Sequence, residues 1–437
     1  MKFLRDMHDK AHEQLFKKGK PLEKLYPIYE AQDTILFTPG KVTNVAAHVR
    51  DGLDQKRLMI TVVTALGLCM FMAMYNTGYQ AFRAIEAGAI PLDSWQTSLY
   101  LTMGWEFNTT SLVGCILYGA FFYIPIYAVT MIAGGLIEVL FAVVRRHEIS
   151  EGFLVTGALF PLILAPTTPL WQVAMGIIFG VFVGKEIFGG VGMNFLNPAL
   201  TARAFLFFAY PAQISGDKVW IAAQTTSDGY SSATKVWRIS EGLPEVDASS
   251  GATLLGRAAQ GFYDPDTGVA SGLAALQESG FTWWDAFIGR IPGSMGETST
   301  LFCLVGAAIL IATRIGSWRT MAGAVVGSLV MVLTLNVVGS DSNPFFDVPF
   351  HWHWVLGGFA FAVVYMATDP VTASFTDTGK LIYGFFIGLL GILIRVINPA
   401  YPEGWMLAIL FMNMFAPLID HFIVQANIKR RAARYAA

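Results

Sequence analysis

Long apolar stretches, each bounded by short polar segments, recur along most of the chain. Several approach 20 residues, which is the length a helix needs to cross the hydrocarbon core of a bilayer. The pattern predicts ten membrane-spanning helices, near residues 58–76, 111–144, 151–166, 169–188, 197–210, 299–314, 319–338, 351–367, 381–397 and 403–425. The second is long enough to be kinked at Pro125 or tilted, and the fifth is short.

The composition agrees with a chain that faces lipid. Of its 437 residues, 54% are apolar and 14% are charged, with a mean hydropathy of +0.52. Soluble proteins carry about 25% charged residues. The formal net charge of −2 suggests no nucleic-acid partner. Residues 1–57 are polar and contain 11 Lys or Arg, so we expect a cytoplasmic segment there and not a signal peptide.

Basic residues gather on one side of the predicted spans. They include the N-terminal segment, Arg145, Lys185, Lys380 and the tail at 426–437. The long loop at 211–298 lies on the other side and has five Lys or Arg against ten Asp or Glu. Because positively charged loops stay in the cytoplasm, we expect both termini to be cytoplasmic and this loop to be periplasmic.

Short motifs occur twice along the chain, in the same order. Ala165-Pro-Thr-Thr-Pro169 corresponds to Met366-Ala-Thr-Asp-Pro370, and Asn197-Pro-Ala199 corresponds to Asn398-Pro-Ala400. Glycines at 180 and 184 similarly precede those at 384 and 388. The pattern predicts two five-helix repeats, at 58–210 and 299–425. An odd number of spans inverts the second copy, and inverted repeats typically hold ligands between the halves.

The outer loop contains the segment Asp247-Ala-Ser-Ser-Gly-Ala-Thr253. Small residues such as Ser250 and Gly251 allow a large ligand to approach the backbone, and the Thr253 hydroxyl can be esterified. The same segment also reads as an ordinary turn before Leu254. The residues alone leave both interpretations open.

Two glycine pairs are also open to a structural interpretation. Gly134-Gly135, late in the second span, suits close helix packing or leaves room for a flat ring. Gly189-Gly190 can permit a tight turn, with Asn197 capping the next helix.

Other polar groups adjoin or interrupt the spans. Ser294 and Glu297 fit a capping box before the sixth span, and a helix start there would also suit a phosphate group. Glu138 and Asp420 lie inside spans, together with His421, and Asp369 lies at a helix end. Ionisable residues in a bilayer are costly and usually functional. A salt bridge between Asp420 and the basic tail is the structural alternative.

The three cysteines, Cys69, Cys115 and Cys303, stand alone in apolar runs. Their spacing matches neither a metal site nor a redox motif. We expect them to be buried packing residues, and we expect this chain to hold no metal and no iron–sulfur cluster.

These motifs together resemble the B subunits of the sodium-translocating NADH:quinone oxidoreductases over nearly the whole chain. The resemblance rests on the segments Phe37–Gly40, His48–Asp51, Gly134–Gly135, Arg146–Phe153, Gly189–Ala199, Asp247–Thr253, Ile291–Ser299 and Gln425–Arg430. Phe37 stands where that family often has Tyr. The sister family, the D subunits of ferredoxin-linked electron-transport complexes, shares the flavin site but typically lacks so long an N-terminal segment.

The resemblance implies two flavins on this chain. FMN would be joined through its phosphate to Thr253, in an acceptor motif that includes Asp247, Ser250 and Gly251. The pocket around FMN would also include Ser294, Glu297 and Thr298. Riboflavin would bind without a covalent bond, and Asn194 and Asn197 are our candidates for its contacts.

The resemblance also implies a place for quinone and for sodium. Gly134 and Gly135 would line the ubiquinone site, and Glu138 and Asp420 would belong to the sodium path. The chain would be one subunit of a six-subunit translocase in the bacterial inner membrane. Electrons from NADH, bound on another subunit, would pass through FMN and riboflavin to ubiquinone while sodium moves outward.

Two other functions stay open on the sequence. One is the ferredoxin-linked sister complex, and the other is a solute transporter without redox chemistry, because inverted five-span repeats also build transporters. The sequence contains no Gly-x-Gly-x-x-Gly segment that opens a helix after a strand, so NADH is expected to bind elsewhere.

Overall fold

The computed structural model describes most of the chain. The described residues are 2–17, 20, 22–23, 26–27, 29, 33, 55–87, 89–145, 149, 152–214, 220–224, 253–263, 270–340, 342–398 and 404–436. They are mainly helical, with two short antiparallel pairs of strands. β1 (Ile90–Pro91) pairs with β2 (Ala223–Gln224), and β3 (Phe262–Tyr263) pairs with β4 (Ala270–Ser271).

Six helical segments of the described chain are long and apolar enough to cross a membrane. They contain α3 (Gln55–Glu86), α5 (Leu112–Arg145), α7 (Leu170–Gly184), α15 (Trp318–Val338), α18 (Asp377–Ile397) and α19 (Trp405–Ala436). In the second of them, α5 continues through Pro125. The prediction of an all-helical membrane protein is confirmed.

The other four predicted spans are helical but shorter. Three are the apolar helices α6 (Gly152–Leu162), α8 (Pro198–Ala209) and α14 (Thr300–Ala312). The fourth, predicted at 351–367, is broken into α16 (Phe350–Val355), α17 (Phe359–Phe361) and the π-helix η5 (Ala362–Met366). The count of ten spans therefore stays a prediction.

The remaining elements are short and lie outside the long helices. They are α1 (Lys2–Ala11), η1 (His12–Phe16), α4 (Trp95–Thr102), η3 (Glu186–Phe188), α9 (Pro211–Ile214), α11 (Leu254–Gln260), α12 (Gly272–Gln277), α13 (Trp283–Ile288) and η4 (Pro344–Asp347). Four of these helices fall in the segment 211–298, where the sequence predicted only a loop.

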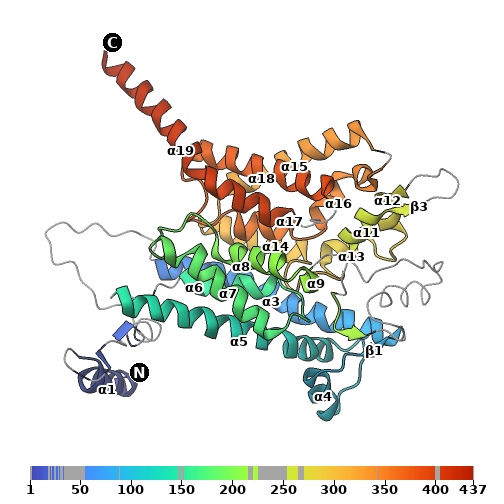
Figure 1. Cartoon of the computed structure of the whole chain (residues 1–437), viewed down its shortest axis with the longest axis horizontal. Helices are drawn as coiled ribbons and strands as arrows, with labels where there is room; N and C mark the ends of the chain where they lie inside the picture. The colour runs from blue at the N-terminus through green and yellow to red at the C-terminus, as the bar shows by residue number, and fades with distance from the viewer. Residues whose placement is uncertain are drawn as a thin grey trace.

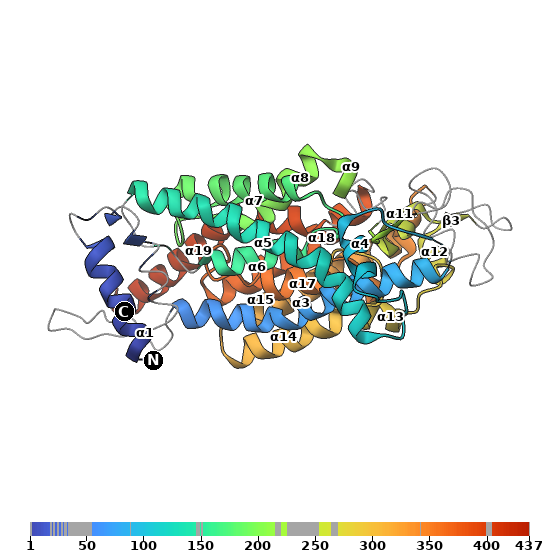
Figure 2. The same cartoon turned by 90° about the horizontal axis from the view of Figure 1, so that it is seen from below.

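The long helices run roughly parallel to the long dimension of the molecule (Figure 2). Figure 1 shows two layers, with α3, α5, α6, α7 and α8 in one and α15, α18 and α19 in the other. α14 contacts α3, and α19 contacts α8, so each half packs against the other. In Figure 2 both chain ends lie at the left end of the molecule, whereas α11, α12 and α13 lie at the right end.

Glycines allow the backbones of neighbouring helices to approach closely. A Cβ atom at Gly384 or Gly388 of α18 would collide with the backbone of α15. A Cβ atom at Gly180 of α7 would lie 2.5 Å from Pro198 O of α8. Small residues at such crossings are typical of membrane helices. In the first half, Gly180 packs against α8, which follows α7 in the chain. In the second half, Gly384 and Gly388 pack against α15, which precedes α18.

Candidate functional site

An inner cavity of about 690 Å³, counting space open to solvent, lies between α3, α6, the segment before α8 and the segment after η5. Apolar side chains such as Met59 and Leu310 form much of the wall. Its polar lining consists of Thr156, Lys185, Asn194, Asn197, Tyr365, Thr368 and Asp369. The structure therefore brings together the two asparagines that the sequence singled out.

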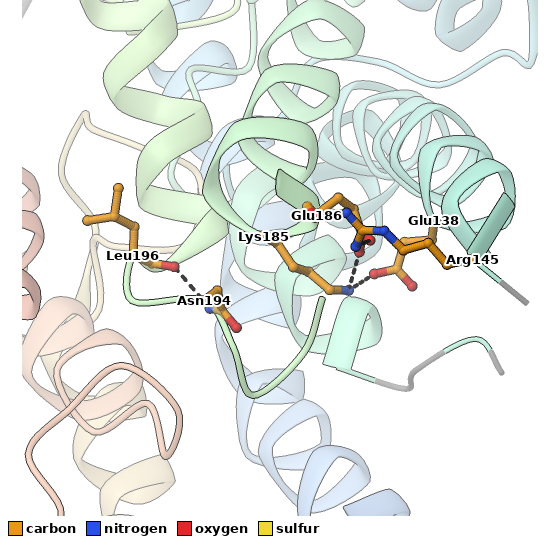
Figure 3. Close-up of polar contacts among 6 residues, drawn as sticks. All are labelled: Glu138, Arg145, Lys185, Glu186, Asn194 and Leu196. Atoms are coloured by element: carbon orange, nitrogen blue, oxygen red, sulfur yellow. Dashed lines mark hydrogen bonds and ion pairs between the residues drawn. The ribbon is translucent and has the colours of Figure 1, made fainter. Parts of the chain in front are cut away.

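Local structure fixes both asparagines. Asn197 is the N-cap of α8, and its Oδ1 accepts hydrogen bonds from Ala199 N at 3.0 Å and Leu200 N at 3.2 Å. Its Nδ2 donates to Asp369 Oδ2 at 3.4 Å. Asn194 Nδ2 donates to Leu196 O at 3.0 Å (Figure 3). The capping interpretation of Asn197 is confirmed, and contact with a ligand stays a prediction.

The turn before these asparagines requires glycine. Gly189 has φ of +121° and Gly190 has φ of +97°, which side chains rarely adopt. The turn directs the chain from the end of α7 past the cavity to the start of α8. The interpretation of this glycine pair as a turn is confirmed.

A cluster of four charged side chains, three of them buried and the fourth, Arg145, exposed, adjoins the inner cavity (Figure 3). Glu138 of α5 forms an ion pair with Lys185, which directly follows α7. Lys185 Nζ also lies 3.7 Å from Glu186 Oε1, and Arg145 NH1 lies 3.5 Å from Glu186 Oε2. Only 4% of Glu138, 3% of Lys185 and 2% of Glu186 is exposed. Two acids and two bases balance one another at this end of α5.

The glycine pair in α5 lies one turn before Glu138. A Cβ atom at Gly134 would lie 2.5 Å from Phe153 Cε2 and 2.9 Å from Ile177 Cγ1, so this glycine packs tightly against α6 and α7. A Cβ atom at Gly135 would lie 3.7 Å from Phe153, an ordinary contact. Helix packing is confirmed for Gly134. Gly135 leaves room for another group.

An outer cavity of about 320 Å³, counting space open to solvent, lies near the other end of α3. It is lined by Thr253, Leu254, Leu255, Ile291, Pro292, Gly293, Ser294, Glu297, Thr298, Leu356 and Gly357. Four predicted FMN-pocket residues thus meet in one place, although they come from two separate segments. The predicted residues Asp247, Ser250 and Gly251 lie outside the described residues.

Thr253 is held at the edge of the outer cavity. It is the N-cap of α11, and its Oγ1 accepts a hydrogen bond from Gly256 N at 3.2 Å. Asn76 of α3 donates to Ile291 O at 2.9 Å and to Thr298 Oγ1 at 3.4 Å. These contacts tie the cavity wall to the same helix that lines the inner cavity.

The proposed Ser294–Glu297 capping box is wrong. α14 begins at Thr300, and its N-cap is Ser299, which accepts a hydrogen bond from Phe302 N. Glu297 precedes the helix, and its Oε1 forms a buried ion pair with Arg203 NH1 at 2.8 Å. Arg203 also donates to Ser294 Oγ at 3.5 Å. The sequence could not reveal this pairing because Arg203 lies in α8, 94 residues away.

Asp420 of α19 accepts four hydrogen bonds from the segment before α18. The donors are Ser374 Oγ at 2.7 Å, Phe375 N at 2.7 Å, Thr376 N at 3.0 Å and Thr376 Oγ1 at 2.6 Å. Its contacts are therefore with neutral donors in the segment before α18, in place of the salt bridge with the basic tail that the sequence offered as an alternative. The carboxylate fastens α19 to the start of α18.

Comparison with known proteins agrees with these features. Residues 42–429 match the model of the family described as NQR2, RnfD, RnfE. The chain belongs to this family. A protein of Chromohalobacter salexigens, named as the B subunit of a Na(+)-translocating NADH-quinone reductase, is 54% identical over 422 residues, 97% of this chain and 94% of that protein. A protein of the same name from Pseudomonas paraeruginosa is 52% identical over 435 residues, 99% of each chain.

The structure of this family member confirms the expected burial of its cysteines and adds a contact between two of them. All three are buried, as predicted. Cys69 and Cys303 are neighbours, because α3 and α14 bring their Sγ atoms within 3.9 Å of each other. Cys69 Sγ also lies 3.8 Å from the hydroxyl of Tyr365, which lines the inner cavity. A separation of 234 residues hides this pair from any spacing rule.

Sequence reasoning also missed the place of Lys185. From the sequence, Lys185 was only one of the basic residues that indicate the cytoplasmic side. Among the described residues that line the inner cavity, it is the one with a positive charge. A lysine that ends an apolar run, followed directly by Glu186, was the available signal.

Proposed function

We propose that this chain is a membrane subunit of a sodium-translocating NADH:quinone reductase and holds two flavins, one in each cavity. The two relatives described above are named as such subunits, and the chain matches each of them over nearly its full length. The observation that carries the proposal is the presence of two separate cavities, each formed around residues that the resemblance assigns to a flavin. Both cavities lie along α3, where Val62 lines the inner one and Asn76 contacts the wall of the outer one. Fourteen helical residues separate these contacts by roughly 21 Å.

In the outer cavity, Thr253 would hold FMN through a phosphoester. The fit rests on a buried threonine hydroxyl that lines a cavity together with Ser294 and Thr298. Asp247, Ser250 and Gly251 would complete the motif that the attaching enzyme recognises. The ion pair between Arg203 and Glu297 would keep the wall rigid. FMN bound there would supply electron transfer, which no side chain of this cavity provides.

In the inner cavity, Asn194 and Asn197 would hold riboflavin without a covalent bond. The fit rests on the lining, which offers amides, hydroxyls and apolar surface. Its one cation among the described residues, Lys185, is engaged by Glu138, so the cavity suits an uncharged ring better than a phosphate. The capping bonds of Asn197 fix its carbonyl and leave the amide on the side of Asp369.

Ubiquinone and sodium would use neighbouring groups. Gly135 would admit the quinone ring beside Phe153, with Gly134 setting the helix spacing. Glu138, one turn farther, and Asp420 would supply carboxylate oxygens to the sodium path, since hard cations prefer oxygen ligands. The other subunits of a six-subunit complex would deliver electrons from NADH, and sodium would move outward.

We also propose ten spans in two inverted repeats, with both termini cytoplasmic in the bacterial inner membrane. The matched motifs support the inversion because they adjoin opposite cavities. After α6, Leu164 O accepts from Met295 N at 3.1 Å, next to the outer cavity. After η5, Thr368 and Asp369 line the inner cavity. Both chain ends also lie at one end of the molecule in Figure 2.

The purified complex provides the test of this function. We expect NADH to reduce ubiquinone at a rate that sodium increases and that potassium does not. Reduction of ferredoxin, without this activity, would assign the chain to the sister complex. The absence of any flavin on the chain would favour a solute transporter. A reporter fused after Lys429 should be cytoplasmic, and one fused within 215–290 should be outside.

A further inference from the structure

Lys185 belongs to two environments at once. Its side chain lines the inner cavity, and its ammonium forms an ion pair with Glu138 behind the cavity wall. Figure 3 shows Lys185 between Asn194 on the cavity side and the acids Glu138 and Glu186. The residue is therefore placed to exchange one anionic partner for another without leaving its position after α7.

The four charges of this cluster sum to zero, and Asp369 is a further acid in the lining of the inner cavity. Glu138 and Glu186 supply two negative charges, while Lys185 and Arg145 supply two positive charges. Arg145 is committed to Glu186, because it also donates to the main-chain oxygen of that residue at 2.7 Å. Glu138 has no such second cation beside it among the described residues, so its charge is balanced by Lys185.

A negative charge that arrives in the inner cavity would change this balance. In a buried environment of low dielectric, an ammonium is strongly attracted to a nearby anion. If Lys185 turned toward the cavity, Glu138 would be left as a buried charge without a counter-ion, which is strongly unfavourable. A proton or another small cation would then neutralise the carboxylate. Carboxylate oxygen suits a hard ion such as sodium.

We propose that Lys185 is a mobile counter-ion that couples the charge of the inner cavity to the uptake of one sodium ion beside Glu138. This inference rests on the proposed function, in which the cavity holds a redox cofactor and sodium is the transported ion. One negative charge enters the cavity, the ammonium turns toward it, and one sodium ion enters from water. The total charge of the cavity and the cluster is unchanged, so the coupling is one charge to one ion.

The variant Lys185→Met tests this role because methionine fills a similar space without charge. Glu138 should then bind sodium permanently. We expect the Tm of the purified complex to rise steadily with sodium chloride and to be nearly constant in choline chloride, because a ligand that binds the folded state stabilises it. The wild-type complex should show a much weaker sodium response when it is oxidised. The exposed Lys429→Met serves as the matched control and should behave like the wild type.

The double variant Lys185→Met/Glu138→Gln identifies the sodium ligand. Without the carboxylate, the sodium response of Tm should be lost. Equal Tm responses of the single and double variants, or equal responses to sodium and choline, would overturn the proposal. If Lys185→Met does not assemble, Lys185→Arg decides, because a guanidinium holds a carboxylate more firmly. It should raise the sodium concentration for half-maximal turnover about tenfold, a change of 1.4 kcal/mol, and an unchanged value would contradict the role.

A separate measurement distinguishes this inference from the proposed function. Acid extraction of the wild-type complex should release riboflavin. A complex that releases none would refute riboflavin binding in the inner cavity. The Tm responses to sodium would still decide whether Lys185 and Glu138 form the exchange site.

Discussion

The two cavities differ in how they could hold a ligand. The outer one, about 320 Å³ counting space open to solvent, gathers the hydroxyls of Thr253, Ser294 and Thr298 beside Glu297, which forms a buried ion pair with Arg203. The inner one, about 690 Å³, offers amides and hydroxyls, and its ion pair is part of the wall because Lys185 lines the cavity.

This difference suggests a division of labour. A buried hydroxyl offers a point of covalent attachment, whereas convergent polar groups suit a ligand held by contacts alone. The ion pair between Arg203 and Glu297 keeps the wall of the outer cavity rigid. The ion pair between Lys185 and Glu138 can respond to a charge that enters the inner cavity, because Lys185 lines that cavity.

Breaking the outer ion pair should have the largest effect. Arg203→Met removes the cation from Glu297, and an unpaired buried charge costs about 3–5 kcal/mol. The Tm of the complex should fall sharply, and covalent flavin should decrease in the assembled fraction. The exposed Arg431→Met in the tail is the matched control, with an expected change within about 0.5 kcal/mol. An unchanged Tm in Arg203→Met would show that this pair does not support the outer cavity.

The two glycines of α5 should respond differently to a single methyl group. Gly134→Ala places a Cβ atom 2.5 Å from Phe153 and should destabilise the complex by about 1–3 kcal/mol. Gly135→Ala has room and should be neutral or slightly stabilising. Gly135→Val should impair quinone reduction while the flavin content stays normal. Normal quinone kinetics in Gly135→Val would remove this glycine from the quinone site.

These contrasts also show what the sequence could and could not predict. The apolar runs predicted the position of every long helix, because lipid requires about 20 apolar residues at each crossing. Hydropathy could not reveal that 351–367 is broken, since breaking it changes no side chain's polarity. Local rules predicted the cap at Asn197 correctly, because both partners lie within three residues.

Contacts between distant segments were beyond such rules. Arg203 with Glu297, and Cys69 with Cys303, each meet only through helix packing. The capping box at Ser294 failed because Glu297 fits the pattern equally well whether or not a helix begins there. The position of Thr253 beside Ser294 and Thr298 was expected only from the family resemblance.

The two acids proposed for the sodium path should differ in their side effects. Asp420→Asn and Glu138→Gln each remove a carboxylate charge and should raise the sodium concentration for half-maximal turnover about tenfold, equivalent to 1.4 kcal/mol. Flavin content should be unchanged in both. Asp420→Asn should also loosen the junction with Thr376, where four hydrogen bonds meet. Wild-type sodium dependence in both variants would refute the path.

Two helix caps provide the finest comparison of the cavities. Asn197→Ala and Ser299→Ala each remove an N-cap and should cost about 1 kcal/mol. Asn197 lines the inner cavity, so only Asn197→Ala should reduce the riboflavin released by acid. Equal loss in both variants would mean that Asn197 acts on the fold and not on the ligand.

The most direct test of the central claim is fluorescence of this chain after denaturing electrophoresis. The wild-type band should fluoresce because FMN stays attached. Thr253→Val should abolish the signal, since it removes the esterified hydroxyl and preserves the side-chain shape. Thr298→Val removes a second hydroxyl of the same cavity and should keep the signal. A fluorescent band in Thr253→Val would move the attachment to another hydroxyl, such as that of Ser249 or Ser250, and a dark wild-type band would contradict covalent flavin on this chain.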